Sequence, residues 1–171
     1  MAGSKILIQE TTVSSATASV TLTGIDSTYD VYKFVTNNVH SANDGVNPFL
    51  RFTASGTEDS SANYDYAFEN LRTDTTFGNE HLTNDNEINL DNLGNATGEA
   101  FNCIIYLFNF NNSSEFSYMT LEGANINSGG VFKGRHGGGV LTVAQATDGV
   151  KFFMSSGDID SGTFKLYGLV K

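Results

Sequence analysis

Short segments in which apolar and polar residues alternate recur through the 171-residue sequence, and they constrain the fold more than any other feature. A period of two places successive side chains on opposite faces of a β-strand, whereas a helix needs a period near 3.6. The segments are short and are bounded by Gly, Asn, Asp or Ser, as half-buried strands require. The clearest are ASVTLTG with Ala18, Val20 and Leu22 on one face, DVYKFVT with Tyr32 and Phe34, NPFLRFTAS with Leu50 and Phe52, GVKFFMSS with Val150, Phe152 and Met154, and SGTFKLYGLV with Phe164, Leu166 and Gly168.

Three further segments need separate interpretation. The run FNCIIYLFNF is apolar on both faces over its middle, which predicts a central strand. The segment SANYDYAFENLR fits helical spacing through Tyr64, Ala67, Phe68 and Leu71, yet its aromatic content favours a strand. The polar segment 78–99 is rich in turn residues, so we expect a long loop around one short strand at Glu87–Leu90.

Together these patterns predict roughly nine or ten strands, since each alternating segment supplies one. Regularly spaced short strands are typical of an antiparallel β-sandwich, and a jelly-roll-like arrangement is expected. The sequence shows no fixed-period repeat, no Gly/Ser linker and only one proline. We therefore predict an all-β fold with a single β-sandwich domain over residues 1–171.

The charge balance restricts the partners. The chain has 9 Lys plus Arg against 19 Asp plus Glu, a formal net charge of −10, and no basic run. Such a surface repels phosphate backbones and anionic lipids, so we expect neither nucleic-acid nor membrane binding. The start MAGSKILIQE lacks the apolar core of a signal peptide, so no export signal is expected. Cys103 is the only cysteine, which excludes an internal disulfide and predicts a small buried apolar side chain.

The stretch GGVFKGRHGGG, Gly129 to Gly139, resembles a phosphate-binding loop because two glycines bracket four residues and a basic residue follows. A true phosphate loop needs Lys and then Ser or Thr, where this chain has Arg135 and His136. It must also lead into a helix, whereas GGGVLTVAQA predicts a strand with Val140, Thr142 and Ala144 on one face. We therefore expect a glycine-rich hairpin loop and no nucleotide cofactor.

Metal-ligating patterns are weak. The histidines His40, His81 and His136 lie far apart, and one cysteine cannot form a zinc template. Calcium needs no fixed spacing, and Asp158 to Gly162 and Asn84 to Asn92 are its candidate segments. Acidic turns usually bond their own backbone, so no metal site is predicted.

Catalytic and sugar-binding patterns are limited to a few residues. No G-x-S-x-G motif occurs, and no catalytic residue is predicted. The carboxylate pairs that could serve a glycosidase are Glu58 with Asp59 and Asp65 with Glu69. Tyr29, Tyr64 and Tyr66 could stack on a sugar ring if exposed, but cross-strand packing is the favoured interpretation. The glycosylation-like triplets that begin at Asn95, Asn111 and Asn112 are read as ordinary turn sequences.

Several phrases of the sequence resemble a known family. They are TGIDSTYDVYKFV (Thr23 to Val35), RFTASGT (Arg51 to Thr57), NLGNATGEAFNCIIYLFN (Asn92 to Asn109) and SGDIDSGTFKLYGLVK (Ser156 to Lys171). Together they are similar to small β-rich virion structural proteins of tailed bacteriophages, common in marine and cyanobacterial phages, and the closing SGTFKLYGL is the most specific. The resemblance implies a jelly-roll-like structural component of the phage particle, and its pattern supplies no catalytic residues.

The function expected from these observations is a non-enzymatic virion structural protein that decorates the head or tail. Its expected partners are other virion proteins, capsid or tail, and further copies of itself, most simply as a trimer, because symmetric assembly covers exposed sheet edges. The expected location is the virion, assembled in the host cytoplasm, and no cofactor is expected. The alternative is a carbohydrate-binding module that recognises a cell-surface glycan.

Overall fold

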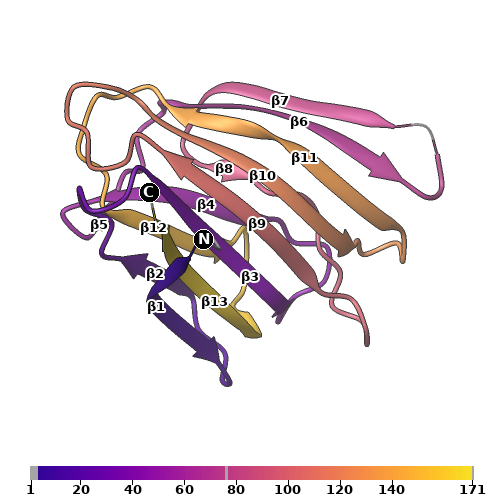
Figure 1. Cartoon of the computed structure of the whole chain (residues 1–171). Coiled ribbons are helices and arrows are strands. Elements are labelled where there is room, and N and C mark those ends of the chain that lie inside the picture. The colour runs from indigo at the N-terminus through magenta and orange to yellow at the C-terminus, as the bar shows by residue number, and fades with distance from the viewer. Residues whose placement is uncertain (1–3, 76, 171) are drawn as a thin grey trace.

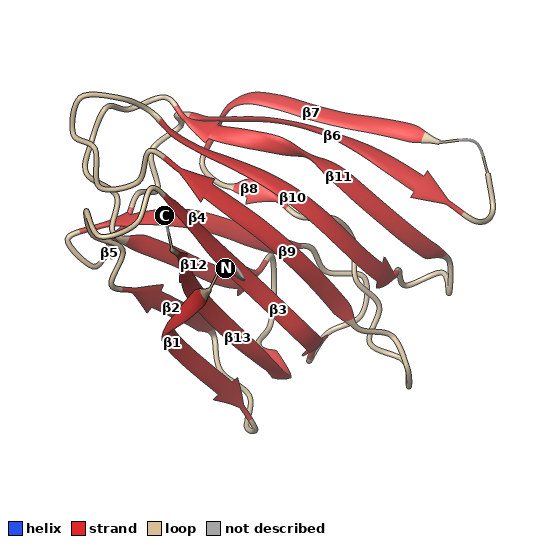
Figure 2. Ribbon diagram, in the orientation of Figure 1, coloured by secondary structure: helices blue, strands red, loops and turns tan. Residues whose placement is uncertain are grey.

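The structure is a computed structural model that describes residues 4–75 and 77–170. Every regular element within these residues is a β-strand, and Figure 2 shows strands and loops with no helix. The strands form two antiparallel sheets packed as a sandwich in one domain, which confirms the predicted fold class. Residues 1–3, 76 and 171 belong to the predicted domain but lie outside the described residues.

The larger sheet has eight strands in the order β1-β13-β3-β9-β10-β11-β6-β7 (Figure 1). In that order the strands are β1 (Lys5–Val13), β13 (Ile159–Leu169), β3 (Val31–Ser41), β9 (Phe101–Phe108), β10 (Ser117–Ile126), β11 (Phe132–Leu141), β6 (Tyr64–Arg72) and β7 (Gly78–Asp85). The strand order places the predicted central strand β9 fourth of eight, and the segment SANYDYAFENLR forms a strand, as favoured.

The smaller sheet has five strands and lies against one side of the larger sheet (Figure 1). Its strands are β2 (Ser19–Thr23), β12 (Gly149–Met154), β4 (Pro48–Ala54) and β5 (Thr57–Glu58), with β8 (Ile88–Asn89) paired to β4. The chain passes between the sheets from β1 to β4 and returns through β12 and β13, so that β13 pairs with β3 and β12 with β4. These crossovers give the sandwich its jelly-roll-like character.

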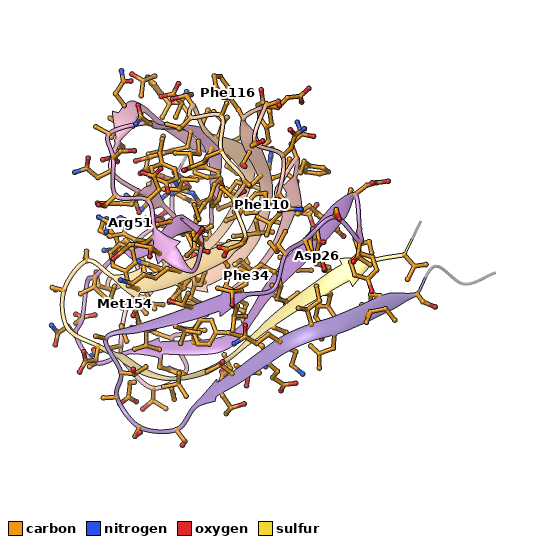
Figure 3. All side chains as sticks on the ribbon, turned by 90° about the vertical axis from the view of Figure 1, so that its left-hand side faces the viewer. Asp26, Phe34, Arg51, Phe110, Phe116 and Met154 are labelled. Atoms are coloured by element: carbon orange, nitrogen blue, oxygen red, sulfur yellow. The ribbon has the colours of Figure 1, made fainter. Side chains whose placement is uncertain are left out.

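The core lies between the two sheets and is aromatic. Phe152 of β12 packs against Phe164 of β13 at 5.1 Å and against Phe101 of β9 at 6.0 Å between ring centroids. Phe34 of β3, labelled in Figure 3, stacks on Phe164 of the neighbouring strand β13 in the same sheet. Each buried phenylalanine contributes roughly 1.5–3 kcal/mol of hydrophobic free energy, so the alternating inward residues hold the layers together.

One glycine of the closing phrase SGTFKLYGL is required by packing. A Cβ built on Gly168 would lie 2.1 Å from the ring of Tyr29. The same tyrosine packs edge-on against Tyr32, whose hydroxyl donates to the Asp26 carbonyl at 2.6 Å. Any larger residue at 168 would therefore displace the loop that precedes β3.

Three sequence expectations were wrong. Thirteen strands are present among the described residues, not nine or ten. Segment 78–99 contains the eight-residue strand β7 in addition to β8, because β7 extends the sheet edge with polar residues that show no alternation of hydrophobicity. Only residues 129–131 of the segment Gly129 to Gly139 lie in the hairpin turn between β10 and β11, where Gly130 has a φ of 74°. The rest is strand: β11 runs from Phe132 to Leu141 and ends before Thr142 and Ala144, the residues expected to share a strand face with Val140.

No helix occurs in the described chain, and hence none that is long and apolar enough to cross a membrane.

Candidate functional site

One side of the larger sheet packs on the smaller sheet, and the other side faces solvent; we call this second side the open face. The strand register arranges most of its residues in three rows that cross the sheet. Taken from β1 towards β7, the first row holds Lys5, Leu169, Val31, Phe108, Tyr118, Val140 and Asp65, the second Leu7, Tyr167, Lys33, Tyr106, Thr120, Gly138, Ala67 and His81, and the third Glu10, Lys165, Val35, Ile104, Glu122, His136, Glu69 and Asn79.

The centre of the open face is apolar. Strand β9 alternates buried Cys103, Ile105 and Leu107 with half-buried Ile104, Tyr106 and Phe108. Tyr118 continues the apolar surface on β10, with 44% of its side chain exposed. The sequence run that is apolar on both faces therefore marks a strand with one face in the core and the other on an apolar surface.

In the second row of the open face, bulky and small residues occupy different halves. In the second row, the half formed by β1, β13, β3 and β9 carries Leu7, Tyr167, Lys33 and Tyr106. The half formed by β10, β11 and β6 carries the small residues Thr120, Gly138 and Ala67 in the same row.

Two hollows lie over this small-residue half. One of about 500 Å³ is lined by Ala67, Tyr118, Gly138 and Val140, and one of about 580 Å³ by Glu69, Phe77 and His136. A Cβ on Gly138 would lie 2.8 Å from the Met119 carbonyl oxygen, so this strand position excludes side chains.

The charges of the open face are also divided between its halves. The half from β1 to β9 carries Lys5, Lys33 and Lys165 against Glu10, a formal charge of +2. Lys33 lies over the ring of Tyr106 at 5.4 Å and Lys5 over that of Tyr167 at 4.8 Å.

The other half, from β10 to β7, carries Asp65, Glu69 and Glu122, a formal charge of −3 with its histidines neutral. His136 faces Glu69 at 3.1 Å, while Glu122 is exposed on β10. The positive half of this face is therefore complementary in charge to the negative half of a second copy of the same face.

The glycine-rich stretch forms no phosphate site, because its basic side chains point into the protein. Arg135 is 1% exposed and donates to Glu80 at 2.9 Å and to the Asn89 carbonyl at 2.9 Å. Its guanidinium also lies 4.3 Å from the ring centroid of Phe68. A phosphate in solvent cannot reach it, and no helix follows.

Lys133 and Asp91 complete this buried cluster. They form an ion pair in which both side chains are nearly inaccessible, and Arg135 lies 3.8 Å from the same carboxylate. Among the described residues, Asp91 Oδ2 and Arg135 Nε have no hydrogen-bond partner. The cluster ties β11 to the segment that contains β8, so we assign it a structural role.

The histidines and the calcium candidates do not converge on a metal site. His81 and His136 line the same hollow of the open face, whereas His40 lies near the end of β3. In the part of the chain that the structure describes, no three His, Cys, Asp or Glu side chains form a group able to hold a metal ion. In the segment Asn84 to Asn92, Asp91 is bound to Lys133; in Asp158 to Gly162, most residues belong to β13.

The carboxylates of the first candidate pair are bound to other side chains. Glu58 binds Arg51 at 2.8 Å and Lys151 at 2.6 Å, while Asp59 accepts a hydrogen bond from Gln145 Nε2.

In the second pair, Asp65 and Glu69 are four residues apart on β6. This separation is about 13 Å along a strand, beyond the 5–9.5 Å of paired glycosidase carboxylates.

The tyrosines singled out for sugar stacking are packed, as favoured. Tyr64 is fully buried, and its hydroxyl donates to the Asp59 carbonyl at 2.9 Å. Tyr66 packs against Phe68, and burial raises the pKa of its hydroxyl to about 12. Tyr29 is half-buried over Gly168. Tyr106 and Tyr167 of the open face are half-buried like Tyr29, and Tyr118 is 44% exposed.

Cys103 is a buried apolar residue, as predicted. Its thiol accepts a hydrogen bond from the Thr36 hydroxyl at 3.4 Å on the core side of β9. Burial raises the pKa of the thiol to about 12, which suppresses the reactive thiolate at neutral pH.

A polar hollow of about 540 Å³ lies in front of β3, beside Asp26. Asp26, Tyr29, Asp30, Asn109 and Asn112 are among its lining residues. The Thr28 backbone amide donates to Asp26 at 2.8 Å and is the main cause that lowers the pKa of this carboxyl. Carboxylate and amide groups beside a tyrosine ring are groups that can bind sugar hydroxyls.

Comparison with known proteins finds no matching protein family, no similar curated protein and no similar solved structure.

Proposed function

We propose that this chain is a non-enzymatic structural component of a tailed-bacteriophage particle, carried on the head or the tail. The open face is the observation that carries the proposal. It is a broad sheet surface with an apolar centre, and large exposed apolar surfaces mark interaction sites in soluble proteins. The phrases that resemble phage virion proteins support the same function.

In this proposal the chain joins the particle as a homo-oligomer and contacts other capsid or tail proteins. The apolar centre of the open face supplies the contact area, and its divided charges select the orientation of the partner. The edge strands β1 and β7 supply further unpaired backbone groups for neighbouring subunits.

The test is to look for the protein in particles purified from an infected host. We expect mass spectrometry to detect it at many copies per particle and cryo-electron microscopy to show density of this sandwich on the head or tail. Its absence from particles that are complete and infectious would contradict the proposal. A native mass measurement of the purified chain gives the oligomer count, and a trimer would agree with the count expected from the sequence.

Glycan binding is the second candidate function, favoured by the polar hollow at Asp26, Asp30 and Asn109. The test is binding to a glycan array by wild-type protein and by Asp30→Ala. Asp160→Ala is the matched control, because Asp160 is exposed on β13 and is not among the residues lining the hollow. Binding lost only in Asp30→Ala supports this function, and a blank wild-type array contradicts it.

A further inference from the structure

We infer that the occupant of the open face is a second copy of this chain, related by a two-fold axis parallel to the strands between β9 and β10. This inference rests on the proposed function in one respect: it takes the open face to be an assembly surface. It adds the identity of the partner and the orientation in which that partner binds.

The axis follows from the strand order. The axis runs parallel to the strands at the middle of the eight-stranded sheet. Rotation by 180° about it places the β1–β9 half of one copy over the β10–β7 half of the other. Strand β9 then lies over β10, β3 over β11 and β13 over β6. Packed twisted sheets cross at about 30°, so the central strands stay in register while the outer strands diverge. The central strands therefore decide the fit.

Side-chain size is complementary in this arrangement. In the second row, Tyr106 lies over Thr120 of the second copy and Lys33 lies over Gly138. Further from the axis, Tyr167 lies over Ala67. In this row each bulky residue of one half meets a small residue of the other, and the hollow of about 500 Å³ over Ala67 and Gly138 receives the bulk. In the first row Phe108 lies over Tyr118 of the second copy, and in the third row Ile104 lies over Glu122.

Charge is complementary in the same orientation. Within one chain, Lys33 and Glu122 lie on β3 and β10 with β9 between them. After the two-fold rotation, Glu122 of the second copy lies one strand and one row from Lys33, within reach of a lysine side chain. The +2 half of each copy thus faces the −3 half of the other, and the rotation forms this contact twice.

The size of the face sets an upper limit on the contact area. Eight strands at a spacing of about 4.8 Å and three rows at a spacing of about 6.7 Å give an area on the order of 700 Å² per copy, and the divergence of the outer strands reduces the part that is in contact. Standard protein–protein interfaces bury about 800 Å² per partner. The apolar centre matches the desolvated core of such an interface, and the lysines and carboxylates form its polar rim.

A two-fold interface requires that both complementary parts lie on the same face of the chain, and the open face carries both its positive and its negative half. A three-membered ring uses heterologous contacts, in which one surface of a subunit meets a different surface of the next. Here the two halves are continuous across one sheet, and a self-complementary surface is the signature of a two-fold interface.

The decisive experiment is a charge exchange followed by analytical ultracentrifugation. The variants are Lys33→Glu, Glu122→Lys and the double variant K33E/E122K, with Glu115→Lys in an exposed loop as the control. We expect wild type to be a dimer at micromolar concentration. Each single open-face variant should raise the dissociation constant about tenfold or more, and the double variant should restore it. The control should match wild type.

A second pair of variants tests side-chain size. Thr120→Trp fills the space that Tyr106 of the second copy requires, so we expect it to abolish the dimer. Thr21→Trp is the matched control, because Thr21 is exposed on β2 on the outer side of the smaller sheet. A wild-type monomer or trimer overturns the inference, as does a dimer that is insensitive to Thr120→Trp or a double charge variant that fails to recover.

The inference and the proposed function fail separately. A monomeric chain found in phage particles overturns the pairing and leaves the structural function standing. A dimer that is absent from particles upholds the pairing and overturns the virion role.

Discussion

The two sheets of this sandwich present outer faces that differ in how their charges are satisfied. On the smaller sheet, Arg51 binds Glu58 and Glu87, and Lys151 binds Glu58 as well. Both cations also lie over the ring of Phe153, at 4.9 and 5.6 Å. This ionic network covers the ring of Phe153, and we call the outer side of the smaller sheet the closed face.

On the open face, opposite charges lie mostly in different halves and the apolar centre has no such cover. Both faces come from the same alternation of apolar and polar residues, so alternation alone does not determine whether the charges of a face pair within the chain. A face whose charges pair within the chain has little left to offer a partner. On the open face Lys165 pairs with Glu10 at 3.3 Å, but among the described residues Lys5, Lys33 and Glu122 form no ion pair and remain available to a second molecule.

The largest expected difference is in cysteine reactivity across β9. Cys103 faces the core with a thiol pKa of about 12, whereas Ile104 faces solvent on the open face. In dilute protein at pH 8, we expect the variant I104C/C103S to react with a disulfide reagent at least ~1000-fold faster than wild-type Cys103. Equal rates would show that the open face is covered within the chain itself.

The next largest effect comes from breaking the closed face. Arg51→Ala removes a cation that is 18% exposed and leaves Glu58 and Glu87 without it. We expect the free energy of unfolding to fall by about 2 kcal/mol, because partly buried charges lose their partner. Lys33→Ala on the open face is the matched change, with an expected loss within about 0.5 kcal/mol. Urea denaturation measures both, and equal losses would contradict the distinction between the faces.

The closed face also predicts how stability depends on pH. Burial by itself raises the pKa of Glu58, but hydrogen bonds from Lys151 and Arg51 outweigh it, and the pKa falls below its ordinary 4.5. A carboxyl with a lowered pKa stabilises the fold above its unfolded pKa, and this contribution is lost as pH falls through the folded value.

Glu58→Gln should therefore lower stability at pH 7 and flatten the loss of stability below pH 4.5. Chemical denaturation from pH 7 to pH 3 measures the slope for wild type and variant. An unchanged slope would mean that the network does not hold this carboxylate in its charged form.

The smallest effect is expected on the open face of a single chain. Tyr118→Ser removes a half-exposed ring that packs on no second layer, so the free energy of unfolding in dilute protein should change by only about 0.5 kcal/mol. Tyr66→Ser, on the core side of the same sheet, should cost about 3 kcal/mol. Thermal unfolding compares the two variants, and a large loss in Tyr118→Ser would assign its ring a role in folding.

The sequence predicted strands correctly where apolar and polar side chains alternate with the period of two of a β-strand. The same-face sets around Phe34, Phe52, Phe152 and Phe164 were predicted from alternation, and in the structure these faces are buried. It failed where side chains carry no such signal. Strand β11 contains four glycines among its ten residues, and a glycine has no side chain to reveal which face it occupies.

The candidate site was predicted less well than the fold, because exposure depends on layers that are distant in sequence. The sequence predicts a loop at Arg135. The side chain is buried instead, because the segment containing Asn89 lies against the core side of β11. Likewise, the run from Cys103 to Phe108 marks two apolar faces without saying which one is covered.

The sequence alone determined the all-β class, the strands with clear alternation and the acidic net charge, because each depends on neighbouring residues or on a simple sum. The tertiary structure decided which apolar face stays open, where the lysines and carboxylates of that face lie, and which basic residues are buried. These properties depend on strand order and register, which bring together residues that are far apart along the chain.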